Sequence, residues 1–244
     1  MQIIVYFCGS YFKNSQGGVA RCDYHLSLLF PKRKVFIGPK EKKQMLEYIQ
    51  TCSYPIVFTD NHLSCDIPIN IPTLVFHHGC ALTTAERSPT WKEPWKTLCT
   101  EGQKKMLFYR QPSNTYMLST SLACSHDFTN YFGKTYTQFK KYELLNPCDL
   151  DESRYKTHFN ETSPIVLGNW NDHKKGSEYI SAIQQSMPNF TFKQLQVYLR
   201  NSIEDFNQEK QKIYVNSDIF LQLSVSEGNS YATLDAVMCG LVII

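Results

Sequence analysis

The chain has 244 residues, of which 42% are hydrophobic and 19% are charged, as in an ordinary globular protein with one large or two small domains. Its formal net charge of +3 is too small to indicate a nucleic-acid-binding protein. The nine cysteines include no pair at the C-x-x-C spacing of structural zinc sites, and their odd number without a secretory signal predicts reduced thiols and a cytoplasmic location.

Short apolar runs of strand length alternate with segments of helix length. The runs expected to form strands are residues 3–7, 35–37, 56–58, 74–76, 118–124, 165–167, 219–223 and 241–244. The helical segments between several of them are residues 20–30, 42–51, 101–110 and 177–187. This alternation predicts an α/β fold with parallel sheets covered by helices on both faces.

A polar segment divides the chain. Asn146-Pro147 ends one structural segment, the residues that follow are rich in Asp, Glu, Ser and Lys, and a new strand is expected after Pro164. We therefore expect an N-terminal domain at residues 1–150 and a C-terminal domain at residues 160–244.

The end of the chain carries its most specific pattern, which is strand, tight loop, helix and strand. In the loop, Gly228 allows the backbone to approach a ligand, and Asn229 or Ser230 is suited to cap a helix over residues 231–239. The free N–H groups of the first helical turn and the helix dipole favour an anion there, for which a diphosphate is the obvious candidate.

Two carboxylates stand eight positions apart in this pattern, Glu227 in the loop and Asp235 on the helix. Carboxylates accept hydrogen bonds from sugar hydroxyls, and this separation lets them hold opposite ends of one ligand. In the structural alternative, Glu227 only complements the helix N-terminus and Asp235 lies on a solvated helix face.

This stretch resembles the E-x7-E motif of retaining glycosyltransferases of family 4, which have the GT-B fold and a pattern close to E-G-F-G-L-x-x-L-E-A-x-A-C-G-x-P-V-I. The matching positions include Glu227, Gly228, Leu234, Ala236, Cys239 and Gly240. Asp235 replaces the second Glu, Asn229 the Phe and Ser230 the second Gly. The resemblance implies two Rossmann-like domains, with Glu227 on the sugar and Asp235 on the ribose. In the family a further crossover and a last helix follow the motif, so the second domain is expected to be incomplete, in a chain that is short or C-terminally truncated.

Two further elements are similar to donor-binding elements of the family. Gly17-Gly18 resembles a G-G-V/I loop near the donor phosphate, with a simple strand-to-helix turn as the alternative. Lys175 and the glycine after it match the second half of a G-R…K-G element that binds the diphosphate. Asn169 stands where the family has Arg, so Lys174 is the candidate for the second cation; a solvated Lys at a helix start is the alternative.

Two adjacent histidines, His77 and His78, end the strand expected at residues 74–76. The C-terminal end of a strand in a doubly wound sheet is the ligand side, and family 4 enzymes often have a His near the transferred sugar there. The sequence does not choose between the two, and a buried structural histidine is an equal alternative.

The resemblance implies transfer of a sugar from a nucleotide-diphosphate sugar to a sugar, lipid or protein acceptor, with retention, without a metal and without a cofactor other than the donor. The alternatives are a non-catalytic nucleotide-sugar or protein-binding module of the same fold, and a sugar-nucleotide epimerase. The basic cluster Lys32, Arg33, Lys34, Lys40, Lys42 and Lys43 is expected to be a solvated loop or a peripheral membrane contact. The many Tyr, Phe, Lys and Asn residues hint at an AT-rich genome, for example a viral one.

Overall fold

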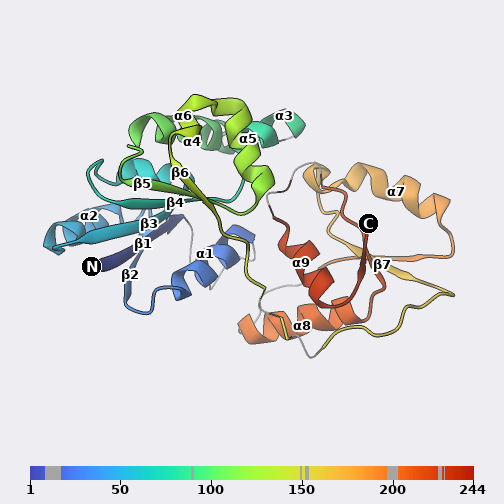
Figure 1. The fold of residues 1–244 in the computed structure, drawn as a ribbon. Helices are drawn as coiled ribbons and strands as arrows, with labels where there is room; N and C mark the ends of the chain where they lie inside the picture. Colours follow the sequence, from blue (N-terminus) through green and yellow to red (C-terminus); the bar gives the residue numbers. More distant parts are fainter. Residues whose placement is uncertain are drawn as a thin grey trace. The chain divides into compact units, whose positions relative to one another are not determined.

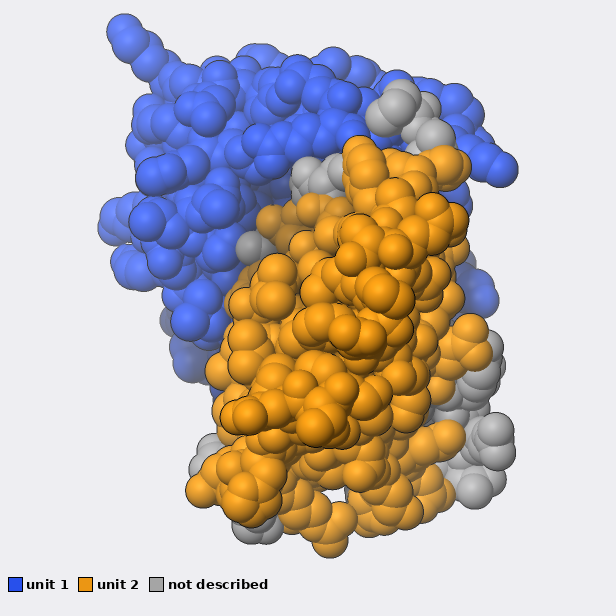
Figure 2. All heavy atoms as spheres, turned by 90° about the vertical axis from the view of Figure 1, so that its right-hand side faces the viewer, with its two compact units in different colours: residues 1–146 blue, residues 147–244 orange. Residues whose placement is uncertain are grey.

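The computed structural model describes residues 1–8, 18–88, 91–148, 150–151, 154–196, 203–224, 227 and 229–244. The chain divides into two compact units, Met1–Asn146 (unit 1) and Pro147–Ile244 (unit 2), which Figure 2 shows in different colours. Among the described residues, each unit is built on its own parallel sheet, with six strands in unit 1 and four in unit 2 (Figure 1). The prediction of an α/β fold with parallel sheets is confirmed.

The elements of unit 1 follow the expected alternation. They are β1 (Gln2–Cys8), α1 (Gly18–Leu28), β2 (Arg33–Gly38), α2 (Lys42–Thr51), β3 (Pro55–Asp60), the 3₁₀ helix η1 (Asn61–Asp66), β4 (Thr73–His77), α3 (Ala81–Arg87), α4 (Trp95–Tyr109), β5 (Thr115–Ser119), α5 (Leu122–Phe132), α6 (Lys134–Thr137) and β6 (Lys140–Glu143). The sheet order is β2-β1-β3-β4-β5-β6, and each neighbouring pair is parallel. The strand order therefore reverses between β1 and β3, which makes the C-terminal ends of these strands the expected ligand side.

The two faces of this sheet bury different side chains because residues alternate along each strand. Tyr6 and Val57 point to the face covered by α2 and η1, where they belong to a core cluster. Phe7, Phe58 and Phe76 lie on the other face, where Phe7 and Phe76 contact Phe58 edge-on with ring centroids 5.2 and 6.4 Å apart. Figure 1 shows α1 on one side of the sheet and α4, α5 and α6 on the other.

The prediction of a strand at residues 118–124 is wrong for the second half of that range. β5 ends at Ser119, and α5 begins at Leu122. Ser121 caps this helix, because its Oγ accepts a hydrogen bond from the Cys124 N–H at 3.2 Å. Cys124 and Phe128 are thus buried as one face of a helix, in a core cluster with residues of β4, β5, α4 and α6.

Unit 2 repeats the same plan on a smaller scale. Its elements are β7 (Ile165–Gly168), the 3₁₀ helix η2 (His173–Lys175), α7 (Ser177–Ser186), β8 (Thr191–Gln194), α8 (Ile203–Val215), β9 (Ile219–Phe220), α9 (Tyr231–Met238) and β10 (Val242–Ile243). The strand order β10-β9-β7-β8 reverses between β7 and β9. One core cluster joins the sheet to α8 and α9, and a second one, around Val166 and Trp170, includes Ile180 of α7. The sequence patterns did not predict β8 and α8.

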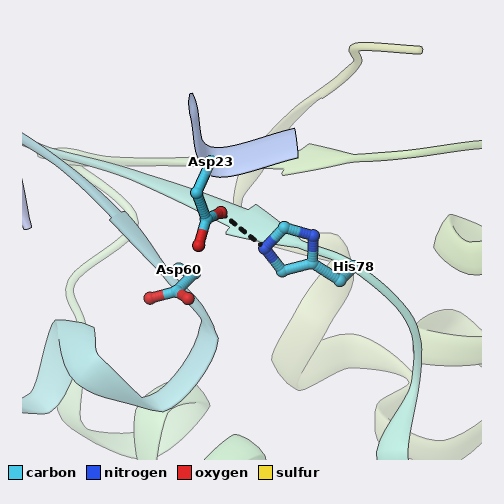
Figure 3. Close-up of side chains that lie close together, drawn as sticks. All are labelled: Asp23, Asp60 and His78. Atoms are coloured by element: carbon cyan, nitrogen blue, oxygen red, sulfur yellow. Dashed lines mark ion pairs between the residues drawn. The ribbon is translucent and has the colours of Figure 1, made fainter. Parts of the chain in front are cut away.

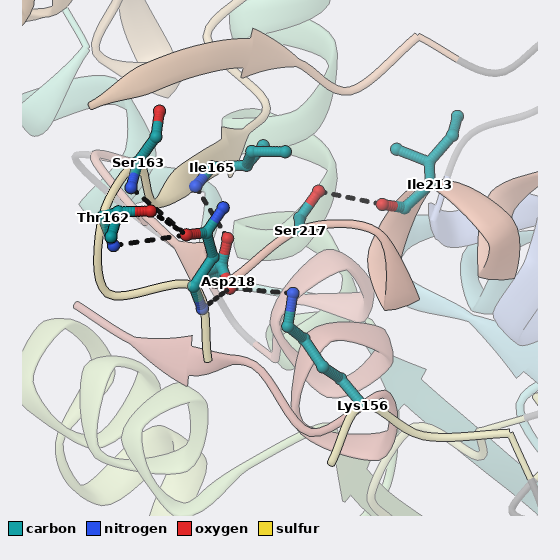
Figure 4. Close-up of polar contacts among 8 residues, drawn as sticks. Lys156, Thr162, Ser163, Ile165, Ile213, Ser217 and Asp218 are labelled. Atoms are coloured by element: carbon teal, nitrogen blue, oxygen red, sulfur yellow. Dashed lines mark hydrogen bonds and ion pairs between the residues drawn. The ribbon is translucent and has the colours of Figure 1, made fainter. Parts of the chain in front are cut away.

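Asp218 ties the segment before β7 to the sheet of unit 2 (Figure 4). This residue is 1% exposed, and its carboxylate accepts hydrogen bonds of 2.8 Å from the backbone N–H groups of Asn160 and Ile165, with Lys156 Nζ also at 2.8 Å. Burial alone would raise the pKa of this carboxyl group, but the hydrogen bonds from Lys156, Ile165 and Asn160 outweigh it and hold the pKa below its usual value. Residues 151–159, which the sequence placed in neither domain, thus fall within unit 2.

Candidate functional site

Lys175 and Glu227 lie side by side at the C-terminal edge of the unit 2 sheet, although 52 positions separate them in sequence. Lys175 ends η2, which follows β7, and Glu227 lies between β9 and α9. The Lys175 ammonium contacts Glu227 Oε1, and the two side chains are 29% and 28% exposed. Because the strand order reverses between β7 and β9, this ion pair occupies the place where such sheets bind ligands, and both charges remain accessible.

Gly176 fixes the position of Lys175. Its φ of 79° lies in the left-handed region, and a Cβ there would stand 2.4 Å from Leu223 Cβ and 2.7 Å from the Leu223 carbonyl oxygen. Only glycine fits this close approach without displacing the chain after β9. Asp172 adds a cap, because its Oδ1 accepts a hydrogen bond from the Lys175 N–H at 3.1 Å. Together these contacts hold η2 against the segment that leads to Glu227.

Polar side chains continue from Glu227 to the N-terminus of α9. Gln222 Nε2 lies 3.4 Å from Glu227 Oε1, and Gln222 Oε1 accepts a hydrogen bond from Thr233 Oγ1 at 3.2 Å. Ser230, not Asn229, is the N-cap of α9, since its Oγ accepts a hydrogen bond from the Thr233 N–H at 3.3 Å. The N-terminus of α9 is the positive end of the helix dipole, which favours an anion. Sequence reasoning missed Gln222, for which the pattern gave no signal.

Further donor-binding candidates are Gly17, Gly18, Asn169, Lys174 and Gly228. Gly17 and Gly228 lie outside the described residues, and Gly18 is the first residue of α1. Asn169 directly follows β7 and is partly buried, as is Lys174. Asn169 therefore occupies the strand end where the family pattern has an Arg, but supplies no positive charge.

Asp235 has a partner inside unit 2. It is 1% exposed, and its Oδ2 lies 2.9 Å from Nζ of Lys210 on α8. Cys148 Sγ approaches the other carboxylate oxygen at 3.6 Å, and the Lys210 ammonium also lies over the ring of Phe206 at 5.3 Å. The alternative of a solvated Asp235 is wrong, and the carboxylate expected at a ribose is instead part of a buried ion pair that joins α9 to α8.

In unit 1, His77 is a buried, neutral side chain at the end of β4. It is 0% exposed, its ring centroid is 4.2 Å from that of Phe128, and its Nδ1 is 3.0 Å from Asn61 Oδ1. Asn61 Oδ1 also accepts from Gln103 Nε2 at 3.1 Å, so it is an acceptor and His77 Nδ1 carries the proton. Burial, and then the proximity of His78, lower the pKa of His77 to about 3. These contacts match the structural alternative for His77.

His78 lies in a different environment, together with two aspartates (Figure 3). Its Nε2 is 3.1 Å from Oδ1 of Asp23 on α1, and Asp60, the last residue of β3, completes the group. Burial lowers the pKa of His78 to about 4, an effect that Asp60 partly offsets, and burial raises the pKa of Asp23 well above its usual value. Sequence reasoning missed both aspartates; an Asp that ends a buried strand was the available signal for Asp60.

The basic cluster is only partly a loop. Arg33 and Lys34 belong to β2, the edge strand of the unit 1 sheet, and Arg33 donates a hydrogen bond to the Phe30 carbonyl at 3.2 Å. Lys42 lies 2.6 Å from an Asp66 carboxylate oxygen. No helix in the described part of the chain is both long and apolar enough to cross a membrane. Of the nine cysteines, the eight with described side chains are free thiols.

No protein-family model matches the chain, and no curated protein is significantly similar to it. The likeness to family 4 glycosyltransferases therefore stays a prediction that depends on the residues of the motif.

Proposed function

We propose that the chain is a GT-B-type glycosyltransferase that transfers a sugar from a nucleotide-diphosphate sugar to an acceptor, with retention and without a metal in the transfer step. The observation that carries the proposal is the Lys175–Glu227 contact. It lies at the switch point of the unit 2 sheet, where the strand order reverses between β7 and β9, and close to the capped N-terminus of α9. A cation, an acid and a helix N-terminus at one place suit a ligand that is a phosphate at one end and a sugar at the other.

In this proposal the diphosphate binds to Lys175 and at the positive N-terminal end of α9. The phosphate takes over the Lys175 ammonium, which frees Glu227 to accept hydrogen bonds from sugar hydroxyls. Negative charge grows on the phosphate as its bond to the sugar breaks. A fixed cation and a helix N-terminus stabilise this transition state more than they stabilise the bound donor.

Asp235 has a positioning role in the proposed enzyme. Its ion pair with Lys210 holds α9 against α8, and the N-terminus of α9 is the anion-binding element. The residue that resembles the second acid of the E-x7-E motif then acts through the helix and not through contact with the ribose.

A second candidate function, a non-catalytic nucleotide-sugar-binding module, is favoured by two observations. Asn169 provides no charge at the strand end where the family pattern has Arg, and the Asp235 carboxylate is already paired with Lys210. Either departure weakens the stabilisation of charge that transfer requires, while leaving diphosphate binding at Lys175 possible.

A thermal-shift screen with UDP, GDP, ADP and their hexose conjugates identifies the donor, because a ligand that binds only the native state raises the unfolding temperature. Lys175→Gln should weaken nucleoside diphosphate binding roughly 10- to 100-fold, the value of a lost charge-assisted hydrogen bond. Glu227→Gln should keep the fold and lower transfer or donor hydrolysis by about 100-fold or more. Glu178→Gln, an exposed acid of α7 that pairs with His173 at 3.1 Å, is the matched control.

The outcomes separate the two candidates. Turnover that falls in Glu227→Gln but not in Glu178→Gln supports the transferase. Nucleotide binding without turnover, lost in Lys175→Gln, supports the binding module. A Glu227→Gln variant with unchanged turnover contradicts the role assigned to Glu227.

A further inference from the structure

The Asp23–Asp60–His78 cluster of unit 1 gathers three metal-ligating side chains that the proposed transfer does not use. Asp60 ends β3, His78 directly follows β4, and Asp23 reaches the same place from α1 (Figure 3). One ligand atom from each residue lies within 4.8 Å of the other two. The cluster stands beside the reversal of strand order between β1 and β3, where doubly wound sheets bind ligands.

Asp23 is the member of the cluster that the surrounding protein leaves unsatisfied. It is 2% exposed, and neither of its carboxylate oxygens has a hydrogen-bond partner in the part of the chain that the structure describes. Its one ion pair among those residues is the 3.1 Å approach to His78 Nε2, an atom that also has no hydrogen-bond partner there. The two atoms are therefore close without forming a directed hydrogen bond, an arrangement that is strongly disfavoured when both are buried.

A shared cation would satisfy both atoms. Two ligand atoms that each lie about 2.1 Å from one ion, at the angles of tetrahedral or octahedral sites, stand roughly 3.0–3.4 Å apart, and the observed separation of Asp23 Oδ1 and His78 Nε2 is 3.1 Å. The third ligand, Asp60, needs only a small inward movement, because the three atoms are at most 4.8 Å apart.

We infer that Asp23, Asp60 and His78 bind one divalent cation of the Mn²⁺ or Zn²⁺ class. Carboxylates accept all such ions, whereas the imidazole ligand disfavours Mg²⁺ and Ca²⁺, which prefer oxygen. The ion neutralises the charge of two buried carboxylates. Three protein ligands leave at least one coordination position open, so the bound ion offers unit 1 a place for a water molecule or a substrate oxygen.

The test uses full-length protein that has been treated with EDTA and then freed of chelator. Titration with MnCl₂ and with ZnCl₂ in the calorimeter should show one ion bound per chain, and the bound ion should raise the unfolding temperature. Loss of a group that hydrogen-bonds to a metal ligand already lowers metal affinity about 10- to 100-fold. Loss of a direct ligand in Asp23→Asn or His78→Gln should therefore lower the affinity at least about 100-fold. His126→Ala, which removes an exposed histidine of α5, should bind the ion like the parent protein.

Three results would overturn the inference: no binding at millimolar Mn²⁺ or Zn²⁺, equal affinity in the Asp23→Asn and parent proteins, or loss of binding in His126→Ala. If the ligand variants do not fold, pulsed electron paramagnetic resonance of Mn²⁺ on the parent protein decides the question. Nitrogen hyperfine coupling from one imidazole is expected, and a signal without nitrogen coupling contradicts His78 as a ligand. None of these measurements involves a nucleotide sugar, so their outcome does not depend on whether the proposed sugar transfer is correct.

Discussion

Removal of one partner of the buried ion pair between Lys210 and Asp235 should strongly destabilise unit 2. The two side chains are 5% and 2% exposed, and Nζ lies 2.9 Å from Oδ2. At an effective dielectric constant of about 20, this separation corresponds to an attraction of about 6 kcal/mol, which offsets the desolvation of the two ions. Asp235→Asn removes the negative charge that lies 2.9 Å from the buried Lys210 ammonium, so we expect a loss of about 3–5 kcal/mol in the free energy of unfolding.

Urea unfolding followed by the fluorescence of Trp170 measures this loss. Trp170 is buried in unit 2 with its ring 6.2 Å from that of Phe192, and a background with Trp91→Phe and Trp95→Phe removes the signal of unit 1.

The double variant Lys210→Met/Asp235→Leu is the control, because it replaces the ion pair by apolar groups of similar volume. It should recover to within about 2 kcal/mol of the parent or exceed it. A loss below about 1 kcal/mol for Asp235→Asn, the range of exposed ion pairs, would refute the reasoning. Nucleotide binding that survives in the double variant would support a positioning role for Asp235.

Two further predictions concern His77 and Gly176. The pKa of His77 is about 3 in the folded protein against 6.5 for the free side chain, so the unfolded state binds the proton first and stability is lost as the pH falls below 6.5. This contribution is about 1.4 kcal/mol per pH unit, or about 2 kcal/mol between pH 6.5 and 5. Urea titrations at each pH should show that this slope is reduced by one proton in His77→Asn, and equal slopes in the two proteins would contradict the prediction. Gly176→Ala should destabilise unit 2 by about 1–3 kcal/mol in the same urea assay, because its φ is 79° and the new Cβ meets Leu223; an unchanged midpoint would contradict this.

The alternation of apolar runs and helical segments was sufficient to predict two parallel sheets, because a strand buried on both faces is recognisable as a short apolar run. The same rule misassigned residues 118–124. An apolar run does not distinguish a buried strand from the buried face of a helix, and the deciding signal was Ser121, a capping residue inside the run. α8 was missed for the opposite reason, since Lys210 and other charged side chains hide its apolar face in the sequence.

The candidate site was predictable only where the sequence keeps its residues together. Glu227 and Ser230 lie within one strand–helix unit, so their proximity follows from local spacing. Lys175 was identified from a separate element, and its contact with Glu227 depends on the close approach of Gly176 to Leu223, which no periodicity reveals.

Asp23 and Asp60 show the limit of this reasoning. Each lies on a different element, and only the order of the strands brings them to His78. An isolated Asp on a helix carries no sequence signal, because most such residues are solvated.

The two switch points of this chain have opposite chemical preferences. In unit 1 the end of β3, the residue after β4 and helix α1 contribute Asp60, His78 and Asp23, which suit a cation. In unit 2 they contribute Lys175 and a capped helix N-terminus, which suit an anion, with Glu227 beside them. Since the sheets share one architecture, the fold alone selects neither preference. The few residues that follow the strand ends set it, and for that reason the proposed function depends on the Lys175–Glu227 contact and not on the likeness of the two sheets.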